Sequence, residues 1–472
     1  MPKLKAVFRC QQCAYTSLKW LGQCPDCGEW NSLIEEVEEV LTRVPSKGAA
    51  WTSLSSEVTS LKEVAAKQDP RVATGMLEMD RLLGEGLVAG QVLLLAGPPG
   101  IGKSTLLLQL AAGLSERGMR SLYVSGEESL SQISRRAHRL GLKAPKLSLV
   151  SETNLEKILK TLDTVKPQLV VVDSIQTVYH PEMSGAAGSV GQVRACAGEL
   201  LSAAKNSGAV LFLLGHVTKE GVLAGPKILE HMVDTVLYFD TERENPIRVL
   251  RAYKNRFGPT SEIGLFEMKE SGLMSVTDAT ALFLGDSRGA APQPGQAISV
   301  AMEGTRPIVV EVQALVSPSR FPYPRRAVTG ADLNRSLVLL AALEKHLKLP
   351  LDNRDVYINL AGGVRMRDPG VDLAMVLAVA GSAKDLAVDP HWVFVGEVGL
   401  LGELRRAPFL SERLREAERI GFTKALVSQK ALEGLPKFEK LQVWGVERIW
   451  EALKVVGLSA RPASPVHRAV PD

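Results

Sequence analysis

The chain has 472 residues, which corresponds to about three domains of ~150 residues each. Hydrophobic residues make up 45% of the sequence and charged residues 23%, and this composition excludes a disordered polyelectrolyte. The 56 basic residues nearly balance the 52 acidic ones, so a surface that binds nucleic acid must be local. No apolar run approaches the ~18 residues of a membrane span, and no signal-peptide pattern follows the first Met. We expect a soluble, cytoplasmic protein of several domains without a membrane association.

Two close pairs of cysteines lie near the N-terminus, ten residues apart. Pairs at this spacing are typical of zinc knuckles, in which four thiolates hold one tetrahedral ion. The alternatives are disulfides, which a reducing compartment disfavours, and a chance occurrence of two pairs, which the specific spacing disfavours. We therefore predict a zinc-binding motif over residues 1–34. Its Zn²⁺ ligands are Cys10, Cys13, Cys24 and Cys27.

The rest of the chain divides by composition. A run of carboxylates followed by Pro, Ser and Gly predicts a linker over residues 35–57. From 58 to 280, short apolar runs alternate with amphipathic ones, a pattern that predicts a mostly parallel α/β sheet with helices on both faces. A Gly-, Pro- and Ala-rich stretch predicts a second linker over 281–295, ahead of a further α/β domain over 296–458. Residues 459–472 read as a frayed tail.

The first apolar strand of the central domain, at 92–96, leads into a glycine-rich run and a helix over 104–116. The run is Gly97-Pro98-Pro99-Gly100-Ile101-Gly102-Lys103-Ser104-Thr105. It fits G-x-x-x-x-G-K-[ST] in the strand–loop–helix context that this motif requires. Backbone N–H groups of such a loop and the helix N-terminus bind phosphate oxygens. We expect Lys103 to bind the β and γ phosphates of ATP and Ser104 to ligate Mg²⁺.

Two further predicted strands end beside carboxylates. The strand at 169–172 precedes Asp173, which we expect to hold Mg²⁺ at the carboxyl edge of the sheet. Without the neighbouring phosphate motif, Asp173 would be read as an ordinary strand end. The strand at 121–124 precedes Glu127 and Glu128, and we favour Glu127 as the group that orients the attacking water. The other glutamate is then a solvated acid at the start of a helix.

The fourth apolar strand, at 209–214, is followed by His216. We expect His216 to sense the γ-phosphate and relay its presence to a neighbouring loop, while the alternative is a hydrogen-bonded histidine at a strand end. Residues 181–191, which are rich in Gly, Ala and Ser, lie between two of these strands. They predict an inner loop that grips single-stranded nucleic acid, or else a plain surface loop.

The run Lys254-Asn255-Arg256-Phe257-Gly258 continues a predicted strand that starts near Ile247. A spacing of two residues places Lys254 and Arg256 on one face of a strand. Two aligned cations suit a polyphosphate, and we expect them to serve the phosphates of the next subunit as a finger supplied in trans. The alternative is an ordinary basic strand face.

The four-cysteine motif, the phosphate motif and the run from Lys254 to Gly258 together resemble the bacterial RadA family, also called Sms, of DNA-repair and recombination ATPases. The resemblance spans nearly the whole chain and adds a Lon-protease-like domain at its C-terminal end. It implies a RecA-like core in a homo-oligomeric, hexameric, DnaB-like ring. It also implies binding of single-stranded and branched DNA, branch migration driven by ATP, and recombinase or replication proteins as partners.

Lon proteases use a serine at the start of a helix and a lysine farther along the chain. By position, Gly370 stands for the serine and Ser411 for the lysine, so the domain lacks both nucleophile and base. Asp368 as cap and Pro369 as first helical residue still predict an apolar helix. Residues 319–326 interleave aromatics with arginines, which suits either DNA contact or a solvated basic loop.

The leading hypothesis is a DNA-dependent ATPase that works as a motor in recombinational repair. A second hypothesis is a nucleotide-gated loading or signalling module that recruits a partner helicase without moving DNA itself. The third, an ATP-dependent protease, is disfavoured because the dyad is missing.

Overall fold

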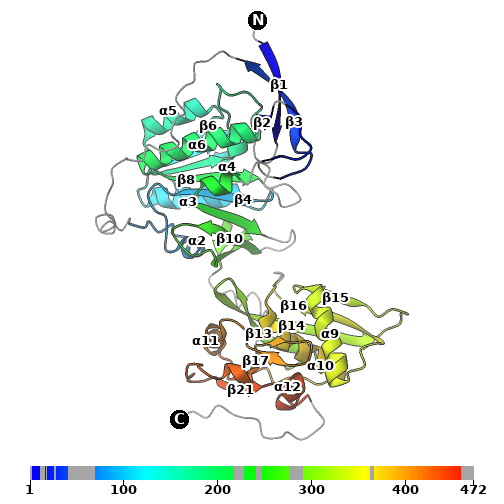
Figure 1. Ribbon diagram of the computed structural model, residues 1–472. Coiled ribbons are helices and arrows are strands. Elements are labelled where there is room, and N and C mark those ends of the chain that lie inside the picture. The colour runs from blue at the N-terminus through cyan, green and yellow to red at the C-terminus, as the bar shows by residue number, and fades with distance from the viewer. Residues whose placement is uncertain are drawn as a thin grey trace. The chain divides into compact units, whose positions relative to one another are not determined.

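In the computed structural model the described residues are 3–10, 16–17, 19–25, 28–40, 70–216, 228–240, 247–276, 291–361 and 366–458. The chain forms two compact units, residues 1–241 with 246–276 and residues 242–245 with 277–472, and each is treated by itself (Figure 1). None of the helices in the described ranges combines the length and the apolar character needed to cross a membrane.

The N-terminal residues form a three-stranded antiparallel sheet in the order β2-β1-β3. Its strands are β1 (Lys3–Cys10), β2 (Thr16–Ser17) and β3 (Leu33–Val40). Strand β1 pairs with β3 along its whole length, with Cys10 opposite Leu33 and Lys3 opposite Val40. The structure differs here from the linker predicted over 35–57, because β1 offers backbone partners to residues 35–40 and they continue β3.

A nine-stranded sheet forms the centre of the first unit, in the order β12-β11-β10-β9-β4-β8-β7-β5-β6. The strands from β9 to β6 are parallel to one another, and β10, β11 and β12 are antiparallel additions at one edge. The strands are β4 (Val92–Gly97), β5 (Ser121–Ser125), β6 (Leu147–Ser151), β7 (Leu169–Asp173), β8 (Val210–His216), β9 (Thr235–Asp240), β10 (Ile247–Asn255), β11 (Ile263–Lys269) and β12 (Gly272–Ser275).

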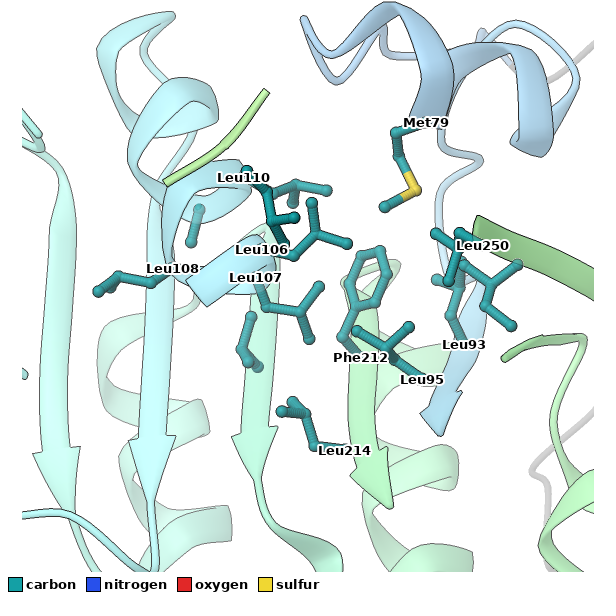
Figure 2. Close-up of a cluster of buried hydrophobic side chains, with 14 of the residues drawn as sticks. Met79, Leu93, Leu95, Leu106, Leu107, Leu108, Leu110, Phe212, Leu214 and Leu250 are labelled. Atoms are coloured by element: carbon teal, nitrogen blue, oxygen red, sulfur yellow. The ribbon is translucent and has the colours of Figure 1, made fainter. Parts of the chain in front are cut away.

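Helices cover both faces of this sheet (Figure 1). They are α2 (Leu77–Leu83), α3 (Lys103–Glu116), α4 (Leu130–Arg139), α5 (Leu155–Val165), α6 (Val190–Ser207) and α7 (Ile228–Met232). Alternate residues of β4 serve the two faces: Leu93 and Leu95 pack with Leu106 of α3, whereas Leu94 packs with Val193 of α6. Figure 2 shows the α3 side of this core, where Met79, Phe212 and Leu250 meet side chains of α3 and β4. The predicted mostly parallel α/β sheet with two helical layers is confirmed.

The second unit contains further α/β sheets, as predicted. A four-stranded sheet has the order β13-β14-β16-β15, a three-stranded parallel sheet the order β17-β20-β21, and β18 pairs with β19. The strands are β13 (Gln296–Glu303), β14 (Arg306–Pro318), β15 (Arg326–Thr329), β16 (Arg354–Leu360), β17 (Trp392–Phe394), β18 (Glu397–Val398), β19 (Leu404–Arg405), β20 (Lys424–Ser428) and β21 (Gln442–Val446). The helices are α9 (Leu333–Leu347), α10 (Asp372–Lys384), α11 (Leu410–Ile420) and α12 (Ile449–Val455).

Helix α10 lies at the centre of this unit and packs on β13 and β14. All residues from Asp372 to Gly381 are buried, which explains why the sequence of this helix is apolar on all sides. Asp368 accepts a hydrogen bond from the backbone N–H of Gly370, and Pro369 begins a single 3₁₀ turn, Pro369–Val371, that precedes α10. The helix therefore starts close to where the sequence predicts it.

Candidate active site

The predicted phosphate-site residues come together at one edge of the nine-stranded sheet. In the parallel register Gly97 at the end of β4 lies opposite His216 at the end of β8, and Ser125 at the end of β5 lies opposite Asp173 at the end of β7. Because side chains alternate along a strand, Asp173 and His216 share a face with Val171 and Leu214, which lie in the core beneath α3. The topology thus brings four separate strand ends to the N-terminus of α3.

The glycine-rich loop of residues 97–104, called here the P-loop, needs glycine for conformation and for space. Gly100 and Gly102 have φ angles of 78° and 112°, which side chains other than glycine rarely adopt. A Cβ atom on Gly102 would also meet Met268 Cε at 2.8 Å and Leu273 Cδ1 at 3.0 Å. Pro99 and Gly100 are exposed, whereas Ser104 and Thr105 are half-buried in the first turn of α3. The loop is therefore open on its outer side and packed on its inner side.

Lys103 is buried beneath this loop, with 4% of its surface exposed. Its Nζ donates hydrogen bonds to the carbonyl oxygens of Gly97 at 2.9 Å and Pro98 at 3.0 Å. Burial lowers the pKa of Lys103 to about 8, against the opposing effect of the negative charges of Asp173 and Glu127. The lysine thus lies within electrostatic reach of both predicted carboxylates.

The predicted metal ligand Asp173 is buried, and its Oδ2 accepts a hydrogen bond of 2.5 Å from the hydroxyl of Tyr123. Burial and the neighbouring carboxylate raise the pKa of Tyr123 well above its usual value, so the phenol remains a donor. The hydroxyl of Ser104 and the carboxylate of Asp173 are hard oxygen donors of the kind that Mg²⁺ prefers. The residues present therefore fit Mg²⁺ bound with ATP. The sequence does not point to Tyr123, because nothing in the buried strand β5 indicates that its one aromatic residue has a hydrogen-bonded hydroxyl.

Glu127 and Glu128 have different surroundings. Oε1 of Glu127 accepts a hydrogen bond from Ser174 Oγ at 2.6 Å and lies 3.0 Å from His216 Nε2. Glu128 forms an ion pair with Arg136 of α4 instead. The side chain of Glu127 is 42% exposed, so water can reach its carboxylate. These contacts support the choice of Glu127 over Glu128 as the group that orients water.

The loop predicted to grip nucleic acid, 181–191, leaves the same unit between β7 and α6, and residues 181–187 are exposed. Its base is held by Gln192, which is 1% exposed. Gln192 Nε2 donates to the carbonyl oxygens of Met183 at 2.9 Å and Gly185 at 3.3 Å, and its Oε1 accepts from the N–H of His180 at 2.7 Å. The buried amide of Gln192 thus holds the backbone at the base of this loop.

Lys254 and Arg256 lie near the amino ends of the parallel strands, whereas the P-loop of the same chain lies at their carboxyl ends. Strand β10 runs antiparallel to β9, so Asn255 is opposite Thr235, and Thr235 is in turn opposite Leu93 near the start of β4. The strand ends at Asn255 and its register shifts between Ala252 and Lys254, so the continuous strand expected through Arg256 is interrupted.

Both cations have partners within their own chain. Lys254 Nζ donates to the carbonyl oxygens of Glu230 at 2.8 Å and Val233 at 2.7 Å. Burial and the neighbouring Arg256 lower the pKa of Lys254. Arg256 forms an ion pair of 3.3 Å with Asp234. Both residues contact the segment that leads into β9, so the two cations lie close to each other although they do not share one continuous strand.

Asp234 is a further residue of this region that the sequence analysis missed. It is 2% exposed and shared among three donors: Lys205 of α6 at 3.0 Å, the backbone N–H of Val92 at 3.1 Å, and Arg256. The carboxylate of Asp234 therefore connects the start of β4 to α6 and also holds the guanidinium of Arg256.

In the second unit, the position predicted for a protease serine is Gly370, which is buried beside the guanidinium of Arg413. Arg413 is 1% exposed and pairs with Asp368, with Nη1 to Oδ2 at 2.6 Å and Nη2 to Oδ1 at 3.0 Å. The residue that faces Gly370 is thus Arg413, two positions beyond the predicted Ser411. Position in the sequence alone does not identify Arg413, because which residue faces Gly370 depends on where helix α11 begins. The two positions assigned to the serine and the lysine hold Gly370 and Ser411.

The aromatic and arginine residues of 319–326 divide by role. Arg325 stacks on the ring of Phe321, with its Cζ 3.9 Å from the ring centre, and Tyr323 is 87% exposed. Arg326 donates to the carbonyl oxygens of Leu351 and Arg354 and so joins β15 to the segment before β16. Both aromatic side chains of this loop are exposed, Phe321 by 50% and Tyr323 by 87%, so Tyr323 is the more accessible of the two to a partner.

Of the four predicted zinc ligands, Cys13 and Cys27 lie outside the described residues. Cys10 and Cys24 are buried in one small cluster with Leu33. The carbonyl oxygen of Cys24 accepts a hydrogen bond from the N–H of Gly28 at 2.9 Å. Burial of both described cysteines in one cluster is compatible with thiolates that bind one metal ion.

Two family models match the chain: one described as an AAA domain over residues 64–222, and one described as a rubredoxin metal binding domain over residues 8–35. The DNA repair protein RadA of Bacillus subtilis is 47% identical over 459 residues, which cover 96% of this chain and 99% of that protein. The protein of the same name from Halalkalibacterium halodurans is 46% identical over 456 residues, with 96% and 99% covered. The protein of the same name from Listeria monocytogenes is 47% identical over 452 residues, which cover 95% of this chain and 97% of that protein. A KaiC-like protein from Pyrococcus horikoshii, 21% identical, matches 44% of this chain and 100% of its own with a TM-score of 0.39.

Proposed function

The chain belongs to the DNA repair protein RadA family, and on that premise we propose that it is an ATP-driven motor that moves branched DNA during recombinational repair. The AAA domain match supports ATP as the energy source. Binding of single-stranded DNA, DnaB-like unwinding and branch migration are the finer activities of this proposal. Work on chromosomal DNA would place the protein in the cytoplasm.

One observation carries the proposal: the two predicted parts of the ATP site lie at opposite edges of one sheet. Lys103 and Asp173 lie at the carboxyl edge, whereas Arg256 contacts Asp234 at the amino edge. The four residue steps from Leu93 to Gly97 separate the edges by about 13 Å. One copy of the chain therefore does not bring both parts to one ATP, which supports a ring in which each copy completes the site of the next.

The chemistry follows from the residues at the carboxyl edge. Lys103 and the P-loop N–H groups bind the β and γ phosphates, and Ser104 and Asp173 hold Mg²⁺. When bound, Mg²⁺ neutralises charge on the β and γ oxygens. Glu127 orients a water and accepts its proton as the water oxygen attacks the γ-phosphorus. The bond from that phosphorus to the β–γ bridging oxygen breaks, which yields ADP and phosphate. Lys254 and Arg256 of the adjoining copy stabilise the charge that develops on the γ-phosphoryl group.

His216 gives this reaction a mechanical output. It contacts Glu127 through Nε2 and is the last residue of β8, so a change at the γ-phosphate reaches the chain that follows β8. The loop 181–191 leads from β7 to α6, and its base is held by Gln192. We expect this loop to contact single-stranded DNA. Recombinase or replication proteins are the protein partners that this role implies.

A second candidate, the nucleotide-gated loading module, is favoured by one observation. Lys254 and Arg256 are both engaged by groups of their own chain, which would suit a switch that releases them once rather than a motor that cycles. We place it second because the water-orienting and sensing residues of a hydrolytic site also lie together at the carboxyl edge.

The test is to measure ATP hydrolysis with and without single-stranded DNA, and migration of a synthetic four-way junction, in the full chain. We expect DNA to stimulate hydrolysis, and Lys103→Ala to abolish both hydrolysis and migration. Junctions that move equally fast without ATP would overturn the motor. Hydrolysis together with helicase recruitment, but without junction movement, would favour the loading module.

A further inference from the structure

The hydroxyl of Tyr123 is buried in the main apolar core of the first unit. The side chain is 1% exposed, and its ring belongs to the same buried cluster as Leu106 of α3, Val171 of β7 and Phe212 of β8. A buried hydroxyl without a hydrogen-bond partner destabilises the fold, so a hydroxyl in this core is expected to have a partner.

Its partner is the carboxylate of Asp173, on the adjacent strand. The hydrogen bond from Tyr123 Oη to Asp173 Oδ2 measures 2.5 Å, the short distance typical of a hydroxyl bonded to an ionised group. Across the described part of the chain, Tyr123 supplies the side-chain hydrogen bond to this carboxylate, and it uses one of the two oxygens. Because packing fixes the ring, the hydroxyl fixes the rotation of the carboxylate and leaves Oδ1 for a cation.

We propose that Tyr123 is a positioning residue for the magnesium site, which orients Asp173 by holding its Oδ2. This inference rests on the proposed function, since it assumes that Asp173 holds Mg²⁺ bound with ATP. Partners that orient a metal ligand from the second layer typically change metal affinity by about 10–100-fold when they are removed. Tyr123 would then set the cation concentration at which the site fills, although it does not itself contact the cation.

The test compares Tyr123→Phe with a matched control in the full chain. Tyr238→Phe is the control, because the hydroxyl of Tyr238 also donates to a carboxylate, Glu230 Oε1 at 3.0 Å, but packs against the opposite face of the same sheet. Mn²⁺ is titrated in the presence of a saturating non-hydrolysable ATP analogue, and electron paramagnetic resonance reports the free ion. Thermal melting without nucleotide or cation reports folding.

We expect Tyr123→Phe to bind Mn²⁺ about tenfold more weakly than the unaltered chain, and Tyr238→Phe to bind it equally well. In an Asp173→Asn background, Tyr123→Phe should have no further effect, because the group that it orients has changed. The inference is overturned if Tyr123→Phe retains full affinity for Mn²⁺, or if it lowers affinity equally with and without Asp173. Should Tyr123→Phe melt early, the comparison within the Asp173→Asn background still decides between orientation and general destabilisation. Failure of the unaltered chain to bind Mn²⁺ with the analogue would instead count against the proposed ATP site.

Discussion

The Nε2 atom of His216 lies 3.0 Å from the Oε1 atom of Glu127, and the same oxygen accepts the hydrogen bond of Ser174. This arrangement connects the end of β8 and the residue after β7 to the loop that follows β5. In the proposed mechanism Glu127 orients water, and this one contact would link its state to His216.

Glu127→Gln should lower ATP turnover by about 10²–10⁴-fold while leaving ATP binding intact, because the amide does not accept the proton of water. Glu128→Gln is the matched control, since its carboxylate is paired with Arg136 and lies apart from the Ser174 and His216 contacts. We expect it to retain turnover within about threefold. Steady-state hydrolysis and equilibrium binding of a fluorescent ATP analogue measure the two effects. Equal losses in both variants would contradict the assignment of Glu127.

ATP affinity should depend on pH through Lys103. Burial holds the pKa of this lysine near 8 in the nucleotide-free protein, so it is charged below pH 8 and loses its proton above it. Because the charged form binds phosphate, affinity should be full below about pH 8 and fall by up to about tenfold per pH unit above it. Lys103→Arg keeps its charge and should give weaker but flat binding over the same range. Equilibrium binding of ATP between about pH 7 and about pH 9.5 checks this. An unaltered chain with flat binding would refute it.

Gly102→Ala should abolish ATP binding. Its Cβ would lie within 3.0 Å of both Met268 and Leu273, at a φ angle of 112°. Gly141→Ala is the control, because Gly141 also has a positive φ, 65°, but an added Cβ meets nothing within 4 Å. We expect the control to lose about 1 kcal/mol of stability and no ATP affinity. Isothermal titration with ATP and thermal melting separate the two results, and ATP binding by Gly102→Ala would show that the inner packing of the P-loop is dispensable.

Arg413→Met should destabilise the second unit by about 3–5 kcal/mol, because it leaves the carboxylate of Asp368 buried without its partner. Urea unfolding followed by the fluorescence of Trp392 and Trp444, which lie in this unit, measures the loss. Gly370→Ser should also destabilise, since its Cβ would lie 2.5 Å from Arg413 Nη1. Neither variant should cleave peptides. A stable Gly370→Ser chain that cleaves peptides would contradict the prediction that this domain has no protease activity.

The sequence predicts best what a contiguous run of residues specifies. The P-loop is recognisable because its glycines, Lys103 and Ser104 follow one another between an apolar strand and a helix. The strands β4, β5, β7 and β8 are buried on both faces and read as apolar runs, so their order along the chain is clear. Strand β6 is less apparent because it lies at the sheet edge and is only partly buried.

The sequence predicts poorly what depends on tertiary contacts. The pairs Tyr123 with Asp173 and Lys205 with Asp234 join residues that are far apart in the chain, and no spacing rule brings them together. The same limit explains why Arg413 rather than Ser411 faces Gly370. That Lys254 and Arg256 lie at the edge away from their own P-loop follows only from the antiparallel placement of β10, which the sequence pattern does not reveal.

The central claim is that Lys254 and Arg256 act on the ATP of an adjoining copy. The direct measurement mixes two inactive variants: Lys103→Ala, which keeps its cations, and the double variant Lys254→Ala with Arg256→Ala, which keeps its P-loop. Each alone should hydrolyse little ATP. In a 1:1 mixture that has exchanged subunits, about a quarter of the sites join an intact P-loop to intact cations, so we expect about a quarter of the DNA-stimulated rate to return. A mixture in which subunits exchange but hydrolysis stays at the level of the separate variants at every ratio would contradict the claim.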